Sequence, residues 1–191
     1  MTQGRVALAL EYDGGGFCGW QRQPHCRSVQ EALEEAIERV TRVPVTVHCA
    51  GRTDTGVHAA AQVVHFDAPV TRPLRAWTFG VNSHLDRRVA VHWAAPVSDD
   101  FHARFSALDR SYRYTILNRP TRPGLHHGTL AWVRQPLDAE RMHAAAQALA
   151  EATRTLRGVE GFDVLETSAV VADGQITEYH TSVRIRFRIA R

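Results

Sequence analysis

A short apolar run leads directly into a turn framed by glycines, and this junction most constrains how the chain can fold. Residues 45–49 are rich in β-branched side chains, which suit a buried strand. Gly51 and Gly56 then bracket Arg52 and Asp54. Because glycine lets the main chain approach a ligand closely, such a turn can hold polar groups against a bound molecule. The pattern predicts a strand that ends at a candidate site.

The cation and the carboxylate of this turn are two residues apart. In extended backbone, Arg52 and Asp54 would point to the same side. We expect the guanidinium to hold Asp54 ionised, ready to act as a nucleophile. A surface turn with a salt bridge explains the same residues equally well, because aspartate is common in turns. Local chemistry leaves both interpretations open.

One helix is predicted with a clear start. Ser28 and Glu31 can form a capping box for a helix that continues to about Arg42. Its apolar stripe is expected to pack in the core, while Glu34 lies on a solvated face. With the strands around it, this helix predicts an α+β fold. The strands are expected at residues 5–12, 45–49, 62–66 and 89–93, with a short helix at 75–81.

The segment 100–107 is dense in rings and cations. His102 and Arg104 alternate with Phe101 and Phe105. The two phenylalanines could anchor the segment while the cations face phosphates. A connection between domains, held by two buried rings, is an equally good interpretation.

Two further strands are predicted nearer the carboxyl terminus. In residues 110–118, Tyr112 and Tyr114 share one face, and we expect Tyr114 to pack in the core. In residues 183–189, apolar residues alternate with arginines. We expect a terminal edge strand whose arginines discourage aggregation, with phosphate binding on its basic face as the alternative.

Composition narrows the class of protein. Of 191 residues, 44% are apolar and 23% are charged, as in ordinary globular proteins, and the net charge of +3 weakly favours a polyanionic partner. No signal peptide and no run of membrane-spanning length are found, so we expect a cytoplasmic protein without a membrane partner. Cys18, Cys26 and Cys49 show no metal-ligand spacing and are expected to be reduced. Neither a metal nor a small-molecule cofactor is expected.

Residues 51–59 resemble the active-site motif of the TruA-type tRNA pseudouridine synthases, with Thr55 where that family usually has alanine. The resemblance extends from the amino terminus to about residue 149. Further matching segments follow in the order of the family, at residues 11–14, 17–21, 28–31, 62–66, 100–107 and 112–114.

This resemblance implies a pseudouridine synthase fold, with two ferredoxin-like (RRM-like) halves around a mostly antiparallel sheet. It implies an isomerase that converts uridine to pseudouridine in the anticodon stem-loop of tRNA, at positions 38, 39 and 40. By the same resemblance, Asp54 is the catalytic nucleophile and Tyr112 lies against the target uracil. Arg52 would occupy the space of the displaced base. The implied partners are tRNA and a second copy of the chain in a homodimer.

The tail departs from the resemblance beyond about residue 150. The family would continue with a stretch that supplies a second active-site arginine, and no such stretch is present. We expect a catalytic domain at 1–105 and a second domain at 106–191 that is truncated and divergent, so that the second half of the fold is incomplete. A disrupted reading frame or a diverged short form would explain this tail. An inactive or weakly active tRNA-binding fragment is therefore the alternative to an active enzyme.

Overall fold

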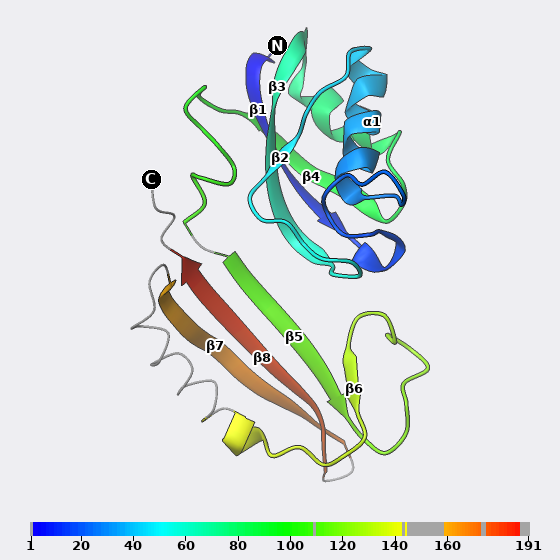
Figure 1. Cartoon of the computed structure of the whole chain (residues 1–191), viewed down its shortest axis with the longest axis vertical. Helices are drawn as coiled ribbons and strands as arrows, with labels where there is room; N and C mark the ends of the chain where they lie inside the picture. Colours follow the sequence, from blue (N-terminus) through cyan, green and yellow to red (C-terminus); the bar gives the residue numbers. More distant parts are fainter. Residues whose placement is uncertain (1, 109, 143, 145–158, 173–174, 188–191) are drawn as a thin grey trace. The chain divides into compact units, whose positions relative to one another are not determined.

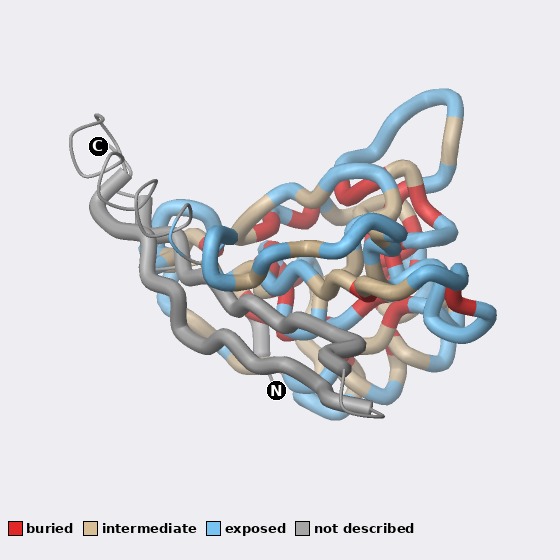
Figure 2. Tube along the Cα trace, turned by 90° about the horizontal axis from the view of Figure 1, so that it is seen from below, coloured by how far each residue is buried: buried red, intermediate tan, exposed pale blue. Residues whose placement is uncertain are grey.

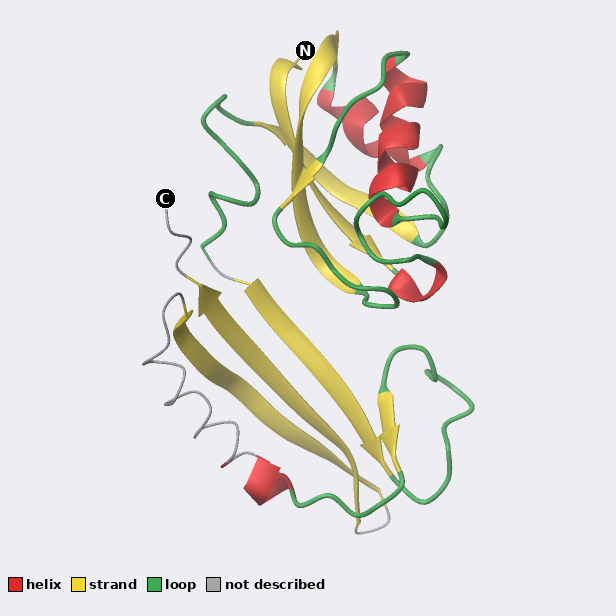
Figure 3. Cartoon of the chain, in the orientation of Figure 1, coloured by secondary structure: helices red, strands yellow, loops and turns green. Residues whose placement is uncertain are grey.

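The computed structural model describes residues 2–108, 110–142, 144, 159–172 and 175–187. The chain divides into two compact units, Met1–Ala107 and Leu108–Arg191. The mixed helix-and-sheet class predicted from the sequence is confirmed in a structure whose sheets are mostly antiparallel (Figure 3). Within the described residues, no helix combines the length and apolar character needed to span a membrane.

The first unit is built on a four-stranded antiparallel sheet (Figure 1). Its central strand β1 is long and apolar, and it pairs with β3 on one side and β4 on the other. β2 completes the order β2-β3-β1-β4. The strands are β1 (Thr2–Tyr12), β2 (His48–Cys49), β3 (Ala59–Arg72) and β4 (Val89–Pro96).

Helix α1 (Val29–Thr41) covers one face of this sheet. It begins as predicted, because the Ser28 hydroxyl accepts a hydrogen bond from the Glu31 backbone N–H at 3.2 Å. The apolar stripe of α1 packs with the inward side chains of β1 and β3 and with the turn η2 (Ala76–Gly80). Buried segments run through the interior and exposed loops surround them (Figure 2).

One charged residue of α1 lies where the sequence pattern did not place it. Glu34 was expected on a solvated face, but it is only 8% exposed. Its carboxylate accepts hydrogen bonds from the Val47 backbone N–H at 3.0 Å and from the Gln30 amide at 2.9 Å. Because the Val47 donor comes from outside the helix, periodicity alone could not indicate burial. Glu34 thus ties α1 to the segment before β2.

A strap at residues 97–107 lies against the same sheet. Arg5 donates from its guanidinium to the carbonyls of Asp99 and Phe101, and Ala103 N–H donates to His65 Nδ1 at 3.1 Å. The expectation of two buried rings is wrong for Phe105, which is 61% exposed. Ala103 is the buried residue of the strap, because its small side chain fits beneath the backbone.

His65 is almost completely buried in this arrangement, with 2% of its surface exposed. Burial lowers the pKa of His65 to about 4, and the neighbouring rings of His102 and His48 act in the same direction. The neutral ring keeps Nδ1 available to accept from Ala103. The strap therefore depends on an uncharged histidine.

The second unit holds another four-stranded sheet, of order β6-β5-β8-β7. β5 runs antiparallel to β8, with Arg110 opposite Ile185 and Leu117 opposite Glu178. β8 therefore lies between two strands, and the prediction of a terminal edge strand is wrong. The strands are β5 (Arg110–Asn118), β6 (Ala131–Val133), β7 (Val159–Ala172) and β8 (Gln175–Phe187).

The side chains of β5 differ from the expected packing. Tyr114 was expected in the core but is 71% exposed, whereas Leu117 is buried. Alternation along a strand separates its two faces but does not say which face the rest of the unit covers. Tyr112 is half-buried on the same strand.

Candidate active site

The glycine-framed turn between β2 and β3 is a closed reverse turn. Val57 N–H donates to the Asp54 carbonyl at 3.1 Å. Gly56 has a φ of 80°, in the left-handed region that other residues rarely adopt. The glycine therefore lets the chain reverse direction immediately after Asp54.

Side chains at the ends of β1 and β3 hold this turn from the sheet side. The Gln62 amide donates to the Gly51 carbonyl at 2.6 Å. The Tyr12 hydroxyl lies 2.8 Å from the Thr53 hydroxyl and 3.3 Å from the Gln62 amide. These buried polar groups satisfy one another, which fixes the backbone on both sides of Arg52.

The loop after β1 holds the turn from the other side. Trp20 is buried, and its backbone N–H donates to the Thr53 carbonyl at 2.9 Å. Gly19 has a φ of 84°, and a Cβ atom there would lie 2.7 Å from the same carbonyl oxygen. Gly14 packs just as closely against the main chain of Val57. Two glycines therefore permit the contact between the loop and the turn.

An ion pair fixes the far end of the turn. His58 Nδ1 lies 2.9 Å from the Asp13 carboxylate, which also accepts from Gly15 N–H at 2.9 Å. Asp13 caps the short helical turn η1 (Gly14–Gly16). The last residues of the turn are in this way tied to the end of β1.

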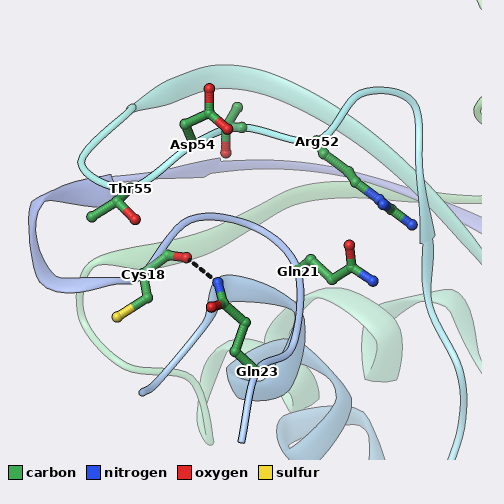
Figure 4. Close-up of a pocket in the computed structure, with 7 residues that line it drawn as sticks. Cys18, Gln21, Gln23, Arg52, Asp54 and Thr55 are labelled. Atoms are coloured by element: carbon green, nitrogen blue, oxygen red, sulfur yellow. Dashed lines mark hydrogen bonds between the residues drawn. The ribbon is translucent and has the colours of Figure 1, made fainter. Parts of the chain in front are cut away.

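The side chains of Arg52 and Asp54 are free although their backbone is fixed. Both are exposed, and neither forms a hydrogen bond or ion pair with any residue that the structure describes. Figure 4 shows them extending in different directions from the turn. The salt bridge expected from their spacing is not formed, because the turn does not continue as extended backbone. Both groups remain available to a ligand.

These two residues border a pocket of about 470 Å³. One wall is the turn itself, and the other is the loop at residues 18–27 (Figure 4). An exposed carboxylate at an open pocket can reach a reacting atom of a bound molecule. The lining residues are Cys18, Gln21, Gln23, Arg52, Thr53, Asp54 and Thr55.

The loop opposite the turn corrects the prediction of reduced cysteines. Cys18 and Cys26 form a disulfide whose Cα atoms are 6.1 Å apart. The loop folds back on itself, with Cys18 N–H donating to the Arg27 carbonyl at 2.9 Å. This fold brings the two thiols together, which the linear spacing could not indicate. The third cysteine, Cys49, is buried.

The predicted site residues are distributed over both units. Arg52 and Asp54 lie on one turn of the first unit, and Tyr112 lies on β5 of the second. The proximity of Tyr112 to Asp54 stays a prediction. Sequence reasoning missed Tyr12 and Gln62 as supports of the turn. Both lie in segments that resemble the family, and their polarity at the ends of otherwise apolar strands is a further signal.

Comparison with known families gives two matches, which cover different parts of the chain. Residues 8–106 match the family described as tRNA pseudouridine synthase, and residues 141–190 match the family described as Dodecin. The tail thus resembles a different family from the one that residues 8–106 match. β7 and β8 lie inside the second match, and β5 precedes it. The second sheet therefore joins strands from within and from outside this match.

Similar curated proteins carry the name tRNA pseudouridine synthase A. The protein of Dechloromonas aromatica is 62% identical over 141 residues, which cover 74% of this chain and 54% of that protein. The proteins of Thiobacillus denitrificans and Nitrosomonas europaea are 55% and 54% identical over 145 residues each, 76% of this chain and 56% and 53% of theirs. This chain spans about half the length of these relatives. By its match over residues 8–106, it belongs to the tRNA pseudouridine synthase family.

Proposed function

We propose that this chain isomerises uridine to pseudouridine in the anticodon stem-loop of tRNA, at positions 38, 39 and 40. Its family and the names of its relatives support the reaction class. The observation that carries the proposal is Asp54, whose exposed side chain borders a pocket while its backbone is fixed from two sides. A nucleophile needs this combination of access and fixed position.

The chemistry requires few groups. The bond from ribose to uracil N1 breaks, the base turns, and a new bond forms from ribose to C5. C5 then loses a proton, and N1 gains one, so the product is an isomer of the substrate. Atoms balance without an oxidant or a cofactor. Asp54 acts as the nucleophile, and its carboxylate is bonded to the reacting nucleotide in the intermediate. The target base must leave its helix, which costs a few kcal/mol, offset by stacking and phosphate contacts. Arg52, unpaired within the described part of the chain, takes the space of the displaced base.

The remaining parts of the proposal concern the second unit. Tyr112, half-buried on β5, stacks on the extruded uracil through its ring face. The chain carries the first ferredoxin-like half of the pseudouridine synthase fold in a catalytic domain at 1–105, and an incomplete second half at 106–191 that is truncated and divergent from about residue 150. The chain acts on tRNA as a homodimer.

Incubation with unmodified tRNA labelled with tritium at C5 of uridine tests the activity, because bond formation at C5 releases the label. We expect release with the unmodified chain. Asp54→Asn should reduce release more than about a thousandfold while tRNA binding stays intact. Asp100→Asn, an exposed aspartate on the strap, is the matched control and should behave like the unmodified chain. Release by Asp54→Asn at the normal rate would refute its role as nucleophile.

Stem-loop RNAs test the position. Each RNA carries a single uridine, at 38, 39 or 40 or at a control position elsewhere in the loop. We expect product from the first three only. Binding without product from any of them would instead indicate a tRNA-binding fragment.

A further inference from the structure

On the loop side of the pocket, the polar side chain of Gln21 has no partner among the described residues. The Gln23 amide donates to the Cys18 carbonyl at 2.8 Å, and Thr53 is bonded to Tyr12. Gln21 is exposed and forms no hydrogen bond with any of the described residues. Figure 4 shows its side chain extending from the loop opposite the catalytic turn, on the side where the Arg52 guanidinium lies.

The backbone on both sides of Gln21 is fixed. Trp20 is buried and bonded to the turn through its N–H. Arg22 N–H donates to the Gln30 side chain at 3.1 Å, and its guanidinium lies 3.3 Å from the buried Glu34 carboxylate. A free side chain on a fixed backbone can pair with a ligand without ordering a loop, which lowers the entropy cost of binding.

The carboxamide matches one edge of uracil. Gln21 offers one acceptor oxygen and two N–H donors. Uracil presents an N3–H donor flanked by carbonyl acceptors, so the amide can form two hydrogen bonds to this imide edge. In the ring, the imide edge lies opposite the bond to ribose. Gln21 and Asp54 likewise lie on opposite walls of one pocket.

We propose that Gln21 determines specificity by binding the imide edge of the extruded uracil, while Asp54 faces its bond to ribose. This inference rests on the proposed function, because it assumes a uridine in the pocket. It assigns base recognition to Gln21 in the loop opposite the turn. The turn at 51–56 supplies the reacting group.

A two-by-two comparison tests this assignment. Wild-type chain and Gln21→Leu are each given stem-loop RNA with uridine or N3-methyluridine at the target position. N3-methylation removes the donor that Gln21 would bind. The wild type should prefer uridine by roughly tenfold in affinity and in turnover, the effect of one or two hydrogen bonds. In Gln21→Leu, which has neither an acceptor nor a donor in its side chain, this advantage should be lost.

Gln23→Leu is the matched control, because Gln23 lines the same pocket but has a partner within the loop. It should keep the preference of the wild type for uridine. A preference that persists in Gln21→Leu, or that is missing in the wild type, overturns the assignment. If no product forms but binding still shows the preference, the proposed activity fails while the role of Gln21 stands.

Discussion

At the scale of single residues, the candidate site depends on buried polar groups behind the exposed ones. Gln62 is buried and donates to the Gly51 carbonyl, and it also lies within hydrogen-bond distance of Tyr12. The motif 51–59 indicated Asp54 and Arg52 from sequence. It did not indicate their supports, because Gln62 and Tyr12 lie outside the motif and reach the turn only when β1 and β3 pair.

Replacement of Gln62 by leucine tests this support. Gln62→Leu keeps the size of the side chain but leaves the Gly51 carbonyl and N–H without their partner. We expect the free energy of unfolding to fall by about 1–3 kcal/mol. Turnover should fall further than tRNA binding, because the position of Asp54 becomes less defined. Urea unfolding and the tritium-release assay measure the two effects. Equal losses of turnover and binding would argue against a positioning role.

His65 gives a prediction about pH. Burial lowers its pKa to about 4 in the folded chain, whereas the pKa of histidine in the unfolded chain is about 6.5. Between these two pH values, the unfolded chain binds a proton at this residue and the folded chain does not. The contribution of His65 to the free energy of unfolding should therefore be fully present above about pH 6.5. The free energy of unfolding should decrease as the pH falls towards 4, by at most about 3 kcal/mol. His102, whose pKa is also lowered, adds in the same direction.

Unfolding in urea at pH 7 and pH 4.5 measures this loss. In His65→Gln, the amide oxygen can still accept from Ala103 N–H, but the side chain does not titrate. The difference in stability between the two pH values should therefore shrink in this variant. An unchanged difference would show that the pH dependence arises elsewhere.

At the scale of elements, the sequence was most informative where a signal is local. The start of α1 follows from Ser28, whose hydroxyl caps the helix. β3 extends from Ala59 to Arg72, well beyond the predicted 62–66, because β1 offers it a partner along most of that length. The place of β8 between two strands likewise depends on pairing with distant residues. Pairing partners of this kind leave no local pattern.

The disulfide of the pocket loop leads to a prediction about the stability of this element. The bond closes a loop with a sequence separation of 8 between Cys18 and Cys26, which the chain-entropy model values at about 2–3 kcal/mol. A reducing agent should lower the melting temperature of the wild type. It should have no effect on the double variant Cys18→Ser/Cys26→Ser, which should melt like the reduced wild type. If the reducing agent also lowered the melting temperature of the double variant, its effect would not arise from the bond between Cys18 and Cys26.

At the scale of the whole molecule, different parts of the chain match different families. The first lies almost wholly within the tRNA pseudouridine synthase match, whereas β7 and β8 of the second lie within the Dodecin match. The resemblance of the early residues ends at about residue 150, and no other family was predicted for the tail. The second match and the pairing of β5 with β8 were therefore not predicted.

The pairing of β5 with β8 makes the second unit testable separately from the first. Thr115 lies in the middle of β5, opposite His180 of β8. Thr115→Pro removes a backbone donor and should disrupt this sheet, because proline is tolerated only at strand edges and bulges. Hydrogen exchange followed by mass spectrometry should show on the order of tenfold faster exchange in β5 and β8. The strands β1 and β3 should keep their protection, because their core is built within the first unit.

Thr121→Pro, in the exposed loop after β5, is the control and should leave both units protected. Loss of protection in β1 and β3 of Thr115→Pro would mean that the first unit depends on the second for its stability.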